Sequence, residues 1–392
     1  MDIKTKCTVI IKGNTMKGQK FKFLDYNIII AVIFISTFGA VILFSSNGDM
    51  KSFIEHLIFM VIGFAGVFIL RQMDYKMWKK IAPACYVLAI FAILLLLTPL
   101  KVSSHGATRW IKLGITIQIS EVVKFLMVIY MAYFLPKHLV ALSRPDGVFK
   151  VWIKIAVIAG MILVISSNLS SCLILLMVTF CMTYISSNIK WFHHVTLIFL
   201  AAVIGILCWI LLQNLPTEEQ LNAIQEVNHQ IVRIIVWLAP ERYPDFSFQT
   251  MQGLYAIGSG GLFGVGLGNS TQSSVLPEAS NDMIFCILCE QLGMFGAALL
   301  LILYGYLFYQ ILLVTLNAKT LFGRYICAGT LFFFAFQTMV NVAVVTGVIP
   351  NTGVTLPFLS SGGSALIIAF AQIGLVLSVY KHDVLDEKQL PK

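Results

Sequence analysis

The chain has 392 residues, of which 58% are hydrophobic and 11% are charged, a balance that excludes a soluble globular domain and indicates a protein embedded in a bilayer. Its formal net charge is +9, but the basic residues lie in short segments between apolar stretches. This distribution is typical of membrane proteins, so we expect membrane lipids, and no nucleic acid, as partners. The 8 cysteines lie mostly within apolar stretches, where thiols pack as small hydrophobic groups, and they indicate no disulfide framework.

Ten apolar stretches are near or above the length of about 17 to 25 residues that a membrane-spanning helix needs. In chain order they cover residues 28–45, 53–70, 81–99, 118–135, 151–168, 170–187, 195–213, 283–315, 323–347 and 364–380. The predicted fold class is therefore an all-α polytopic membrane protein with ten transmembrane helices. The fifth and sixth helices are separated only by the polar sequence SSNLSS, which requires a very tight turn.

The chain divides into a basic N-terminal segment (1–27), a ten-helix membrane domain (28–380) and a C-terminal tail (381–392). The first apolar stretch is too long for the core of a cleaved signal peptide, so we interpret it as the first membrane helix. An even number of crossings places both termini on one side, together with most lysines and arginines. The positive-inside rule then puts both termini in the cytoplasm and an extracytoplasmic loop, about 214–282, between helices 7 and 8. The outer side carries Lys51, Lys101, Arg109, Lys112, Arg233 and Arg242.

Two segments of irregular composition follow the seventh helix. Within 218–237, apolar residues at helical spacing predict an amphipathic helix on the outer surface. The sequence AIGSGGLFGVGLG (256–268) lacks the Lys-Ser/Thr of a nucleotide-binding loop, so we expect a bend or broken helix that lines a cavity. The charge-free sequence IPNTGVTLPFLSSGGSA (349–365) has the helix-breaking residues for the same role.

A charged side chain deep in the bilayer costs about 2.5 to 3.5 kcal/mol on insertion scales, and three residues stand out for this reason: Glu121, Lys124 and Glu290. Gln118, Glu121 and Lys124 are three residues apart and share one helix face. At 1.5 Å per residue, Lys124 lies about 10 Å below the outer end of its helix and Glu290 about 12 Å below Asp282. We expect Lys124 to meet Glu290 inside the bundle, or to be shared between Glu290 and Glu121. A buried ion pair that only positions helices fits the same residues.

Arg109 and Lys112 precede the fourth helix on the outer side, beside Trp110, which suits a membrane interface. Cations next to an outward cavity suit a phosphate or pyrophosphate, for which Arg offers a planar fork of donors. An anchor to lipid headgroups explains the same residues. The sequence alone leaves both interpretations open.

Four sequences in this order, GATRWIKLGITIQISEVVK, AIGSGGLFGVGLG, LPEASNDMIFCILCEQLG and GVIPNTGVTLPFLSSGGS, resemble the RodA/FtsW family, also called SEDS proteins. The resemblance covers nearly the whole chain. It implies a peptidoglycan glycosyltransferase that polymerises lipid II at the outer face of the bacterial plasma membrane and releases undecaprenyl pyrophosphate. It also implies a class B penicillin-binding protein, a transpeptidase, as partner. Members act in division, elongation or sporulation, and NVAVVTGVIPNTG favours the division or sporulation branch.

The resemblance implies roles for single residues. The family's essential outer-loop aspartate corresponds to Asp282, which would take the proton of the attacking sugar hydroxyl, a task worth about 10² to 10⁴ in rate. Arg109 and Lys124 would offset charge on the leaving pyrophosphate. Further candidate substrate-binding residues are Lys112, Gln118, Glu121, Glu278, Glu290, Ser360 and Ser361. A divalent cation, Mg²⁺ or Mn²⁺, would suit the pyrophosphate, but the chain offers no ligand cluster, so no metal site is predicted.

Some alternatives stay open. Asp282 also suits the cap of the eighth helix, because Asp is favoured there. Asn168 in SSNLSS stands where many family members carry an acid, which leaves the role of that turn open. Two other functions fit a polytopic bundle with buried charges: a lipid II flippase, and a scaffold that only holds the transpeptidase. A flippase should line a path to the cytoplasm, whereas the charged candidates are expected toward the outer half.

Overall fold

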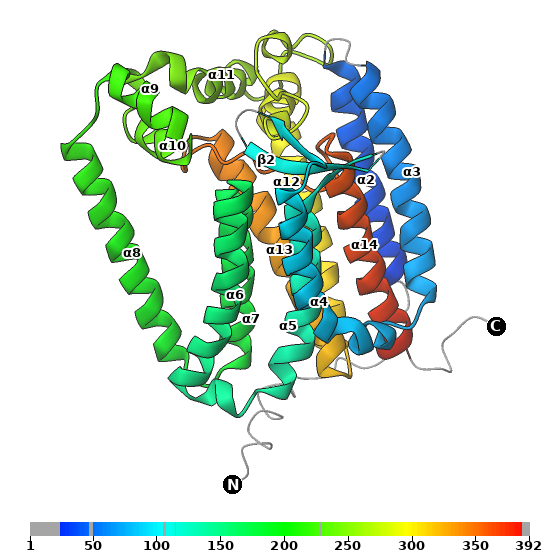
Figure 1. The fold of residues 1–392 in the computed structure, drawn as a ribbon. Helices are drawn as coiled ribbons and strands as arrows, with labels where there is room; N and C mark the ends of the chain where they lie inside the picture. Colours follow the sequence, from blue (N-terminus) through cyan, green and yellow to red (C-terminus); the bar gives the residue numbers. More distant parts are fainter. Residues whose placement is uncertain (1–23, 47–49, 105–106, 114, 228, 386–392) are drawn as a thin grey trace.

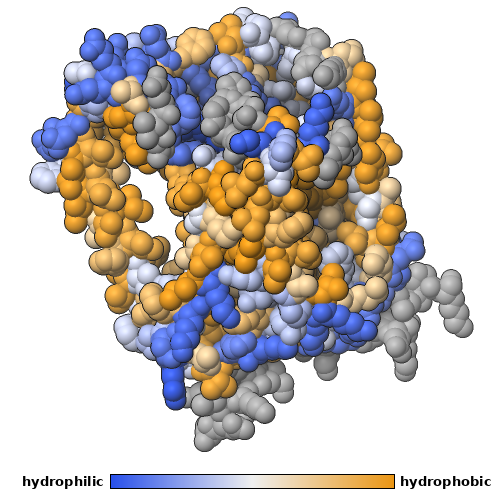
Figure 2. Space-filling model, viewed as in Figure 1, coloured by the Kyte–Doolittle hydropathy of each residue, from blue (hydrophilic) through white to orange (hydrophobic). Residues whose placement is uncertain are grey.

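The computed structural model describes residues 24–46, 50–104, 107–113, 115–227 and 229–385. Most of the predicted N-terminal segment (1–27) and of the tail (381–392) therefore lie outside the described residues. Within the described part, ten helices are long and apolar enough to cross a membrane, which confirms the predicted fold class. Their surfaces form an apolar belt around the middle of the molecule, with hydrophilic residues gathered at its two ends (Figure 2).

The spanning helices stand side by side as a bundle (Figure 1). In chain order they are α2 (Leu24–Ser45), α3 (Met50–Gln72), α4 (Lys76–Leu94, extended by a 3₁₀ turn, Leu95–Leu97), α5 (Ile119–Lys137), α6 (Pro145–Ser166), α7 (Leu169–Ser186), α8 (Lys190–Gln213), α12 (Ile284–Asn317), α13 (Leu321–Val345) and α14 (Gly363–Val379, followed by a π turn, Tyr380–Val384). A 3₁₀ turn, Ala141–Ser143, joins α5 to α6. The tight turn predicted between the fifth and sixth spans is confirmed: α6 and α7 are joined through Ser167, in the left-handed region at φ 48°.

We call the two ends of the bundle the terminal end, where α2 begins and α14 ends, and the loop end, which carries the remaining elements (Figure 1). One of these is a sheet that the sequence analysis did not predict. Its strands β1 (Lys101–Ser104), β2 (Ala107–Leu113) and β3 (Ile115–Gln118) pair as an antiparallel meander, with Ile111 opposite Ile117. The sheet runs directly into α5 and carries Arg109 on its central strand.

The segment between α8 and α12 also covers the loop end. It contains α9 (Glu218–Val227), α10 (His229–Leu238), α11 (Pro244–Gly260) and two 3₁₀ turns, Pro240–Arg242 and Gln272–Ser274. The helical structure predicted over 218–237 is present as α9 and α10, on either side of residue 228, which lies outside the described residues. Leu221 of α9 and Val232 and Ile235 of α10 bury their side chains in one small cluster with Tyr243. The apolar stripe is therefore satisfied within the segment itself.

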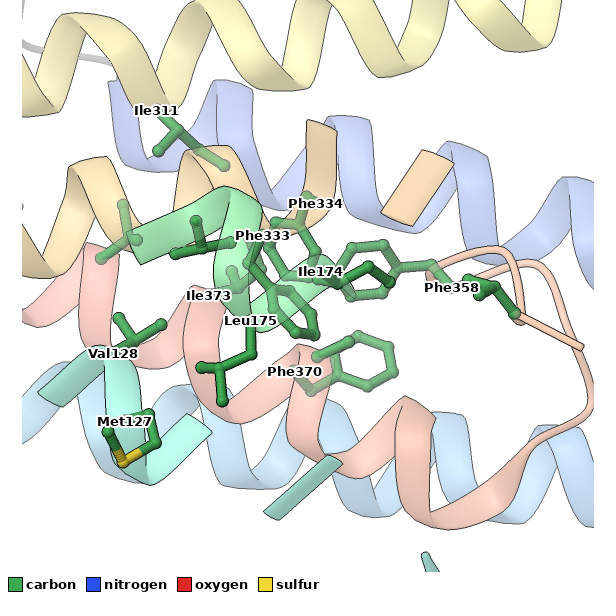
Figure 3. Close-up of a cluster of buried hydrophobic side chains, with 14 of the residues drawn as sticks. Met127, Val128, Ile174, Leu175, Ile311, Phe333, Phe334, Phe358, Phe370 and Ile373 are labelled. Carbon is green, nitrogen blue, oxygen red and sulfur yellow. The ribbon is translucent and has the colours of Figure 1, made fainter. Parts of the chain in front are cut away.

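The bundle core lies between α5, α7, α12, α13 and α14 and supports a loop at the loop end (Figure 3). Phe358, in the segment between α13 and α14, packs its ring against Phe334 of α13 and Phe370 of α14, each at 5.3 Å between centroids. The expected break between the last two spans is thus present as an ordered loop. The ring of Phe358 therefore anchors this loop to α13 and α14, two well-buried helices of the bundle.

Helix α12 is interrupted at Gly293, whose φ of 64° and ψ of −165° are not helical. The glycine-rich stretch 256–268 packs into this break: the N–H groups of Met294 and Phe295 donate to the carbonyls of Gly261 and Leu262. Residues 284–291 are buried on all sides, whereas Met294 and Phe295 face outward. The predicted eighth span is therefore two helices, 284–292 and 294–317.

Asp282 and Glu290 do not lie at their predicted depths. Gln291 exchanges hydrogen bonds with Ser45, the last residue of α2 at the loop end. Asp282 lies beside a turn whose Leu359 backbone packs against Gly39, six residues or about 9 Å farther from that end. The expectation that Glu290 lies about 12 Å deeper than Asp282 is therefore wrong.

The break at Gly293 gives a test by substitution. A Cβ at Gly293 would lie 2.5 Å from the backbone of Gly264 and Leu262, in a backbone conformation that L-residues disfavour. We expect Gly293→Ala to destabilise the chain by about 1 to 3 kcal/mol or more, seen as a lower melting temperature in detergent. Gly305→Ala, in the same helix with no atom near its Cβ, is the matched control and should be neutral or stabilising. Equal melting temperatures for the two variants would contradict the break.

Candidate functional site at the loop end

Asp282 lies two residues before the start of α12, and its backbone is held from two sides. The Nδ2 of Asn341, in α13, donates to the carbonyls of Asp282 and Val354, both at 2.7 Å. On the other side, Ser360 Oγ donates to the carbonyl of Asn281 at 2.7 Å. These bonds tie the segment to α13 and to the loop between α13 and α14.

The side chain of Asp282 is only 7% exposed, and its Oδ1 makes no hydrogen bond among the described residues. The residue at the N-cap of α12 is Met283, with no side-chain capping bond. A role for Asp282 as a helix cap therefore has no support in the geometry. Its Oδ1 is buried without the donor that would normally satisfy it.

Two arginines lie near this carboxyl group. A Cβ on Gly353 would be 3.6 Å from both Arg109 Nη1 and Asp282 Oδ2, so the two side chains converge on this glycine. Arg109 donates to the carbonyl of Ser167 at 3.2 Å. Arg233 of α10 donates to the carbonyl of Asn351 at 3.3 Å, two residues from Gly353.

Arg233 was not among the predicted site residues. The apolar pattern assigned its segment to a surface helix, and the charge count placed it only on the outer side. The sequence signal was a cation inside the apolar run IVRIIV, on a helix that otherwise needs no charge there. Folding α10 over the bundle brings this cation inward.

The electrostatics favour an acid that exchanges a proton near neutrality. Burial, with a contribution from the charge of Glu278, raises the pKa of Asp282 to about 7, against the opposing effects of Arg233 and Arg109. Burial and the charge of Arg233 lower the pKa of Arg109 to about 10, and burial lowers the pKa of Arg233. Asp282 therefore changes protonation in the range where a general base works best.

A buried ion pair lies farther into the bundle. Lys124 Nζ is 2.7 Å from Glu121 Oε1 and 4.9 Å from the ring centre of Phe333, which confirms the local pairing expected from the helix spacing. The prediction that Lys124 meets Glu290 is wrong, and so is a pair shared with Glu290. Glu290 instead accepts hydrogen bonds from the turn 270–272, including the Thr271 N–H and hydroxyl, both at 3.0 Å. The interruption of α12 brings it to this turn.

A small cavity lies between the ion pair and the loop that borders Arg109 and Asp282. Gln118, Glu121 and Lys124 line it together with Asn168, Ser170, Ser171, Gly353, Val354 and Thr355. Gly353 also borders Asp282, so one loop separates the carboxyl group from the cavity. Asn168 caps α7 by accepting from Ser171 N–H and donates to Ser120 Oγ, so a neutral amide stands at this wall.

The other candidate residues are Lys112, Glu278, Ser360 and Ser361. Lys112 is exposed on β2, and Glu278 is exposed and bonded to the side chain of Asn281. Ser360 and Ser361 both hold Asn281, the latter by a 2.6 Å bond to its side chain. Contact of any of these residues with a substrate stays a prediction.

A metal ion would need ligands that the described residues do not group. Among them, no three or more His, Cys, Asp or Glu side chains are arranged to hold an ion. Asp282 and Glu278 are the acids closest to the arginines, and the arginines themselves oppose a cation there. A divalent cation that arrives with a phosphorylated substrate stays a prediction.

The raised pKa of Asp282 generates a test of stability. Because this carboxyl titrates at about 7 when folded and near its ordinary 3.8 when unfolded, its contribution to stability is complete below about pH 4 and is lost as the pH rises through 7. The amide side chain of the Asp282→Asn variant does not titrate, so the variant lacks this pH-dependent contribution. We therefore expect Asp282→Asn to raise the melting temperature, relative to the unmodified chain, more at pH 8 than at pH 5. Asp245→Asn, at an exposed position, is the control; a pH-independent difference for Asp282→Asn would contradict the perturbed carboxyl group.

Known proteins resemble this chain over most of its length. The family profile for FtsW, RodA and SpoVE, described as cell cycle protein, matches residues 20–384. Stage V sporulation protein E of Bacillus subtilis is 32% identical over 372 residues, which cover 91% of this chain and 97% of that protein. The probable peptidoglycan glycosyltransferase FtsW of Coxiella burnetii is 31% identical over 335 residues, which cover 83% of this chain and 86% of that protein.

Solved structures share the fold. A chain from a peptidoglycan synthase complex, described for its structural coordination of polymerization and crosslinking, has a TM-score of 0.76 at 24% identity and covers 92% of this chain and 98% of its own. The rod shape determining protein RodA of Thermus thermophilus has a TM-score of 0.64 at 24% identity with the same coverage. With the family profile spanning almost every described residue, the chain belongs to the FtsW/RodA/SpoVE family of cell cycle proteins.

Proposed function

We propose that this chain is a peptidoglycan glycosyltransferase that polymerises lipid II into glycan strands. The observation that carries the proposal is the buried carboxyl group of Asp282, with a pKa of about 7, beside Arg109 and Arg233. The names of the relatives support the same activity, and they favour a role in division or sporulation.

The site supplies the proton acceptor and the cations for the leaving group that this reaction needs. The 4-hydroxyl of an acceptor sugar attacks C1 of the donor; the new C1–O bond forms as the bond from C1 to the pyrophosphate breaks. Asp282 takes the hydroxyl proton, and undecaprenyl pyrophosphate leaves with the electron pair. Arg109 and Arg233 offset the charge that grows on this leaving group. Lys124 is less suited to that task than predicted, because Glu121 already balances its charge.

The lipid tail of the substrate has an apolar route to the site. Helix α8 is exposed along its whole apolar length, and Figure 2 shows an opening between it and the rest of the bundle. Its loop end lies beside α10, the helix that carries Arg233 (Figure 1). We propose that the polyprenyl chain occupies this opening while the pyrophosphate faces the arginines.

The proposal includes a topology and a partner. On the basis of the positive-inside rule, we propose that the loop end faces the outside of a bacterial plasma membrane and that both termini lie in the cytoplasm. A class B penicillin-binding protein that crosslinks the product is the proposed partner, in line with the similar fold found in a peptidoglycan synthase complex. A flippase is the weaker alternative, because the charged groups gather toward the loop end and not along a path through the bundle.

Substitution of Asp282 tests the base. We expect Asp282→Asn and Asp282→Ala to lose at least about 10²-fold in the polymerisation of fluorescent lipid II by purified protein, because the proton acceptor is gone. Asp245→Asn, on the exposed side of α11, should retain activity. Binding of the transpeptidase should survive in all three variants. Glycan strands of normal yield from Asp282→Asn would refute the assignment, and would favour a scaffold.

Substitution of Arg233 tests the leaving-group role. We expect Arg233→Gln to lower kcat by about 10-fold or more, since one preorganised cation is lost from the site. Arg242→Gln, a few residues away but exposed, is the matched control and should stay within about twofold. Titration with Mg²⁺ and Mn²⁺ in the same assay tests the predicted cation. Equal activity of the two arginine variants would remove Arg233 from the mechanism.

A further inference from the structure

His56 is a buried residue of α3 that the proposed reaction does not use. Its side chain is 0% exposed, and its Nε2 lies 3.4 Å from the carbonyl oxygen of Ser36 in α2. Because a carbonyl only accepts hydrogen bonds, Nε2 must carry the hydrogen. The other ring nitrogen, Nδ1, is buried and makes no hydrogen bond among the described residues. Buried polar atoms are nearly always paired, so a polar ring at this position requires an explanation.

The ring of His56 lies where the loop between α13 and α14 enters the bundle. Phe59, one turn farther along α3, packs so closely on Gly363 that a Cβ there would be 2.3 Å from its ring. On α2, a Cβ on Gly39 would be 2.7 Å from the carbonyl oxygen of Leu359. The backbone of Ser360, which follows Leu359, faces the imidazole ring of His56. The turn at residues 359–363 therefore packs between α2 and α3. Its contacts with Gly39 and Phe59 are close packing contacts, and its contact with His56 is polar.

This turn is hydrogen-bonded to the residues that precede Asp282. Ser360 accepts a hydrogen bond from the N–H of Leu356 at 2.8 Å and donates to the carbonyl of Asn281 at 2.7 Å. The N–H of Ser361 donates to the carbonyl of Ser280 at 3.1 Å. A displacement of the turn would therefore move the backbone that precedes Asp282.

We propose that His56 is a positioning residue for Asp282: its N–H ties α3 to the carbonyl of Ser36 in α2, its ring lies against the backbone of Ser360, and Ser360 holds the backbone of Asn281. The inference rests on the proposed role of Asp282 as the base. His56 does not touch the reacting atoms. Its effect is large because a misplacement of about 1 Å at a reacting group can cost 10²-fold in rate.

Two variants of His56 distinguish the effect of its hydrogen-bond donor from the effect of its side-chain volume. His56→Leu removes the donor, whereas His56→Gln keeps one, and its amide has two hydrogens for the carbonyls of Ser36 and Ser360. In lipid II polymerisation we expect kcat to fall by about 10-fold or more in His56→Leu with KM unchanged, and by less than about threefold in His56→Gln. Ser36→Ala keeps the carbonyl that the ring contacts and should retain full activity.

Hydrogen exchange at the Ser361 amide gives a measurement that does not depend on activity. Exchange should be faster in His56→Leu than in the unmodified chain, His56→Gln or Ser36→Ala. If the unmodified chain does not polymerise lipid II, the proposed function fails, and exchange at Ser361 still decides the role of His56.

Four results would overturn the role of His56. They are full activity of His56→Leu, equal loss in His56→Leu and His56→Gln, a rise in KM without a fall in kcat, or unchanged exchange at Ser361. Should His56→Leu not fold, His56→Asn tests the same donor, because its amide is one methylene shorter than that of Gln. Activity of His56→Asn equal to that of His56→Gln would also overturn the proposal.

Discussion

The position of Asp282 is secured through its backbone, and this constraint decides what its side chain can do. Donors aimed at a carboxylate stabilise its charge and lower its pKa, which makes it a weaker base. Here the donors of Asn341 and Ser360 bind main-chain carbonyls instead, at Asp282 and Asn281. The residue is therefore fixed in space while Oδ1 of its carboxyl group is left without a donor. Rigidity is supplied by the loop between α13 and α14, which is itself anchored by the ring of Phe358 in the aromatic core.

Much of the architecture follows from the length and the spacing of apolar residues. A bilayer admits few alternatives to helices of about twenty residues, so ten apolar stretches gave ten spans. The pairing of Lys124 with Glu121 also followed from local rules, because residues three apart on a helix are neighbours whatever the tertiary fold. Asp282 was found through resemblance to a family, and the residues alone did not separate a base from a helix cap.

The parts that could not be predicted depend on contacts between distant segments. Glu290 was placed by assuming that one straight helix runs into the bundle from Asp282, but α12 is interrupted at Gly293 and its first part, 284–292, ends beside Ser45 at the loop end. Arg233 was read as part of a surface helix, because the pattern of α10 does not reveal that it packs on α9 and turns a cation toward Asp282. The three-stranded sheet was missed for a related reason: short strands become stable only through their partners.

The ion pair inside the cavity has a consequence for the energetics of a membrane enzyme. A fixed charge within a bilayer gains or loses about 2.3 kcal/mol per 100 mV of the potential that it crosses, so a lone lysine there would couple the site to the energisation of the cell. Lys124 and Glu121, 2.7 Å apart on one helix, form a dipole with no net charge. The electric field across the membrane therefore exerts almost no net force on the floor of the cavity. The arrangement of Asp282 and the arginines is therefore expected to be independent of the membrane potential.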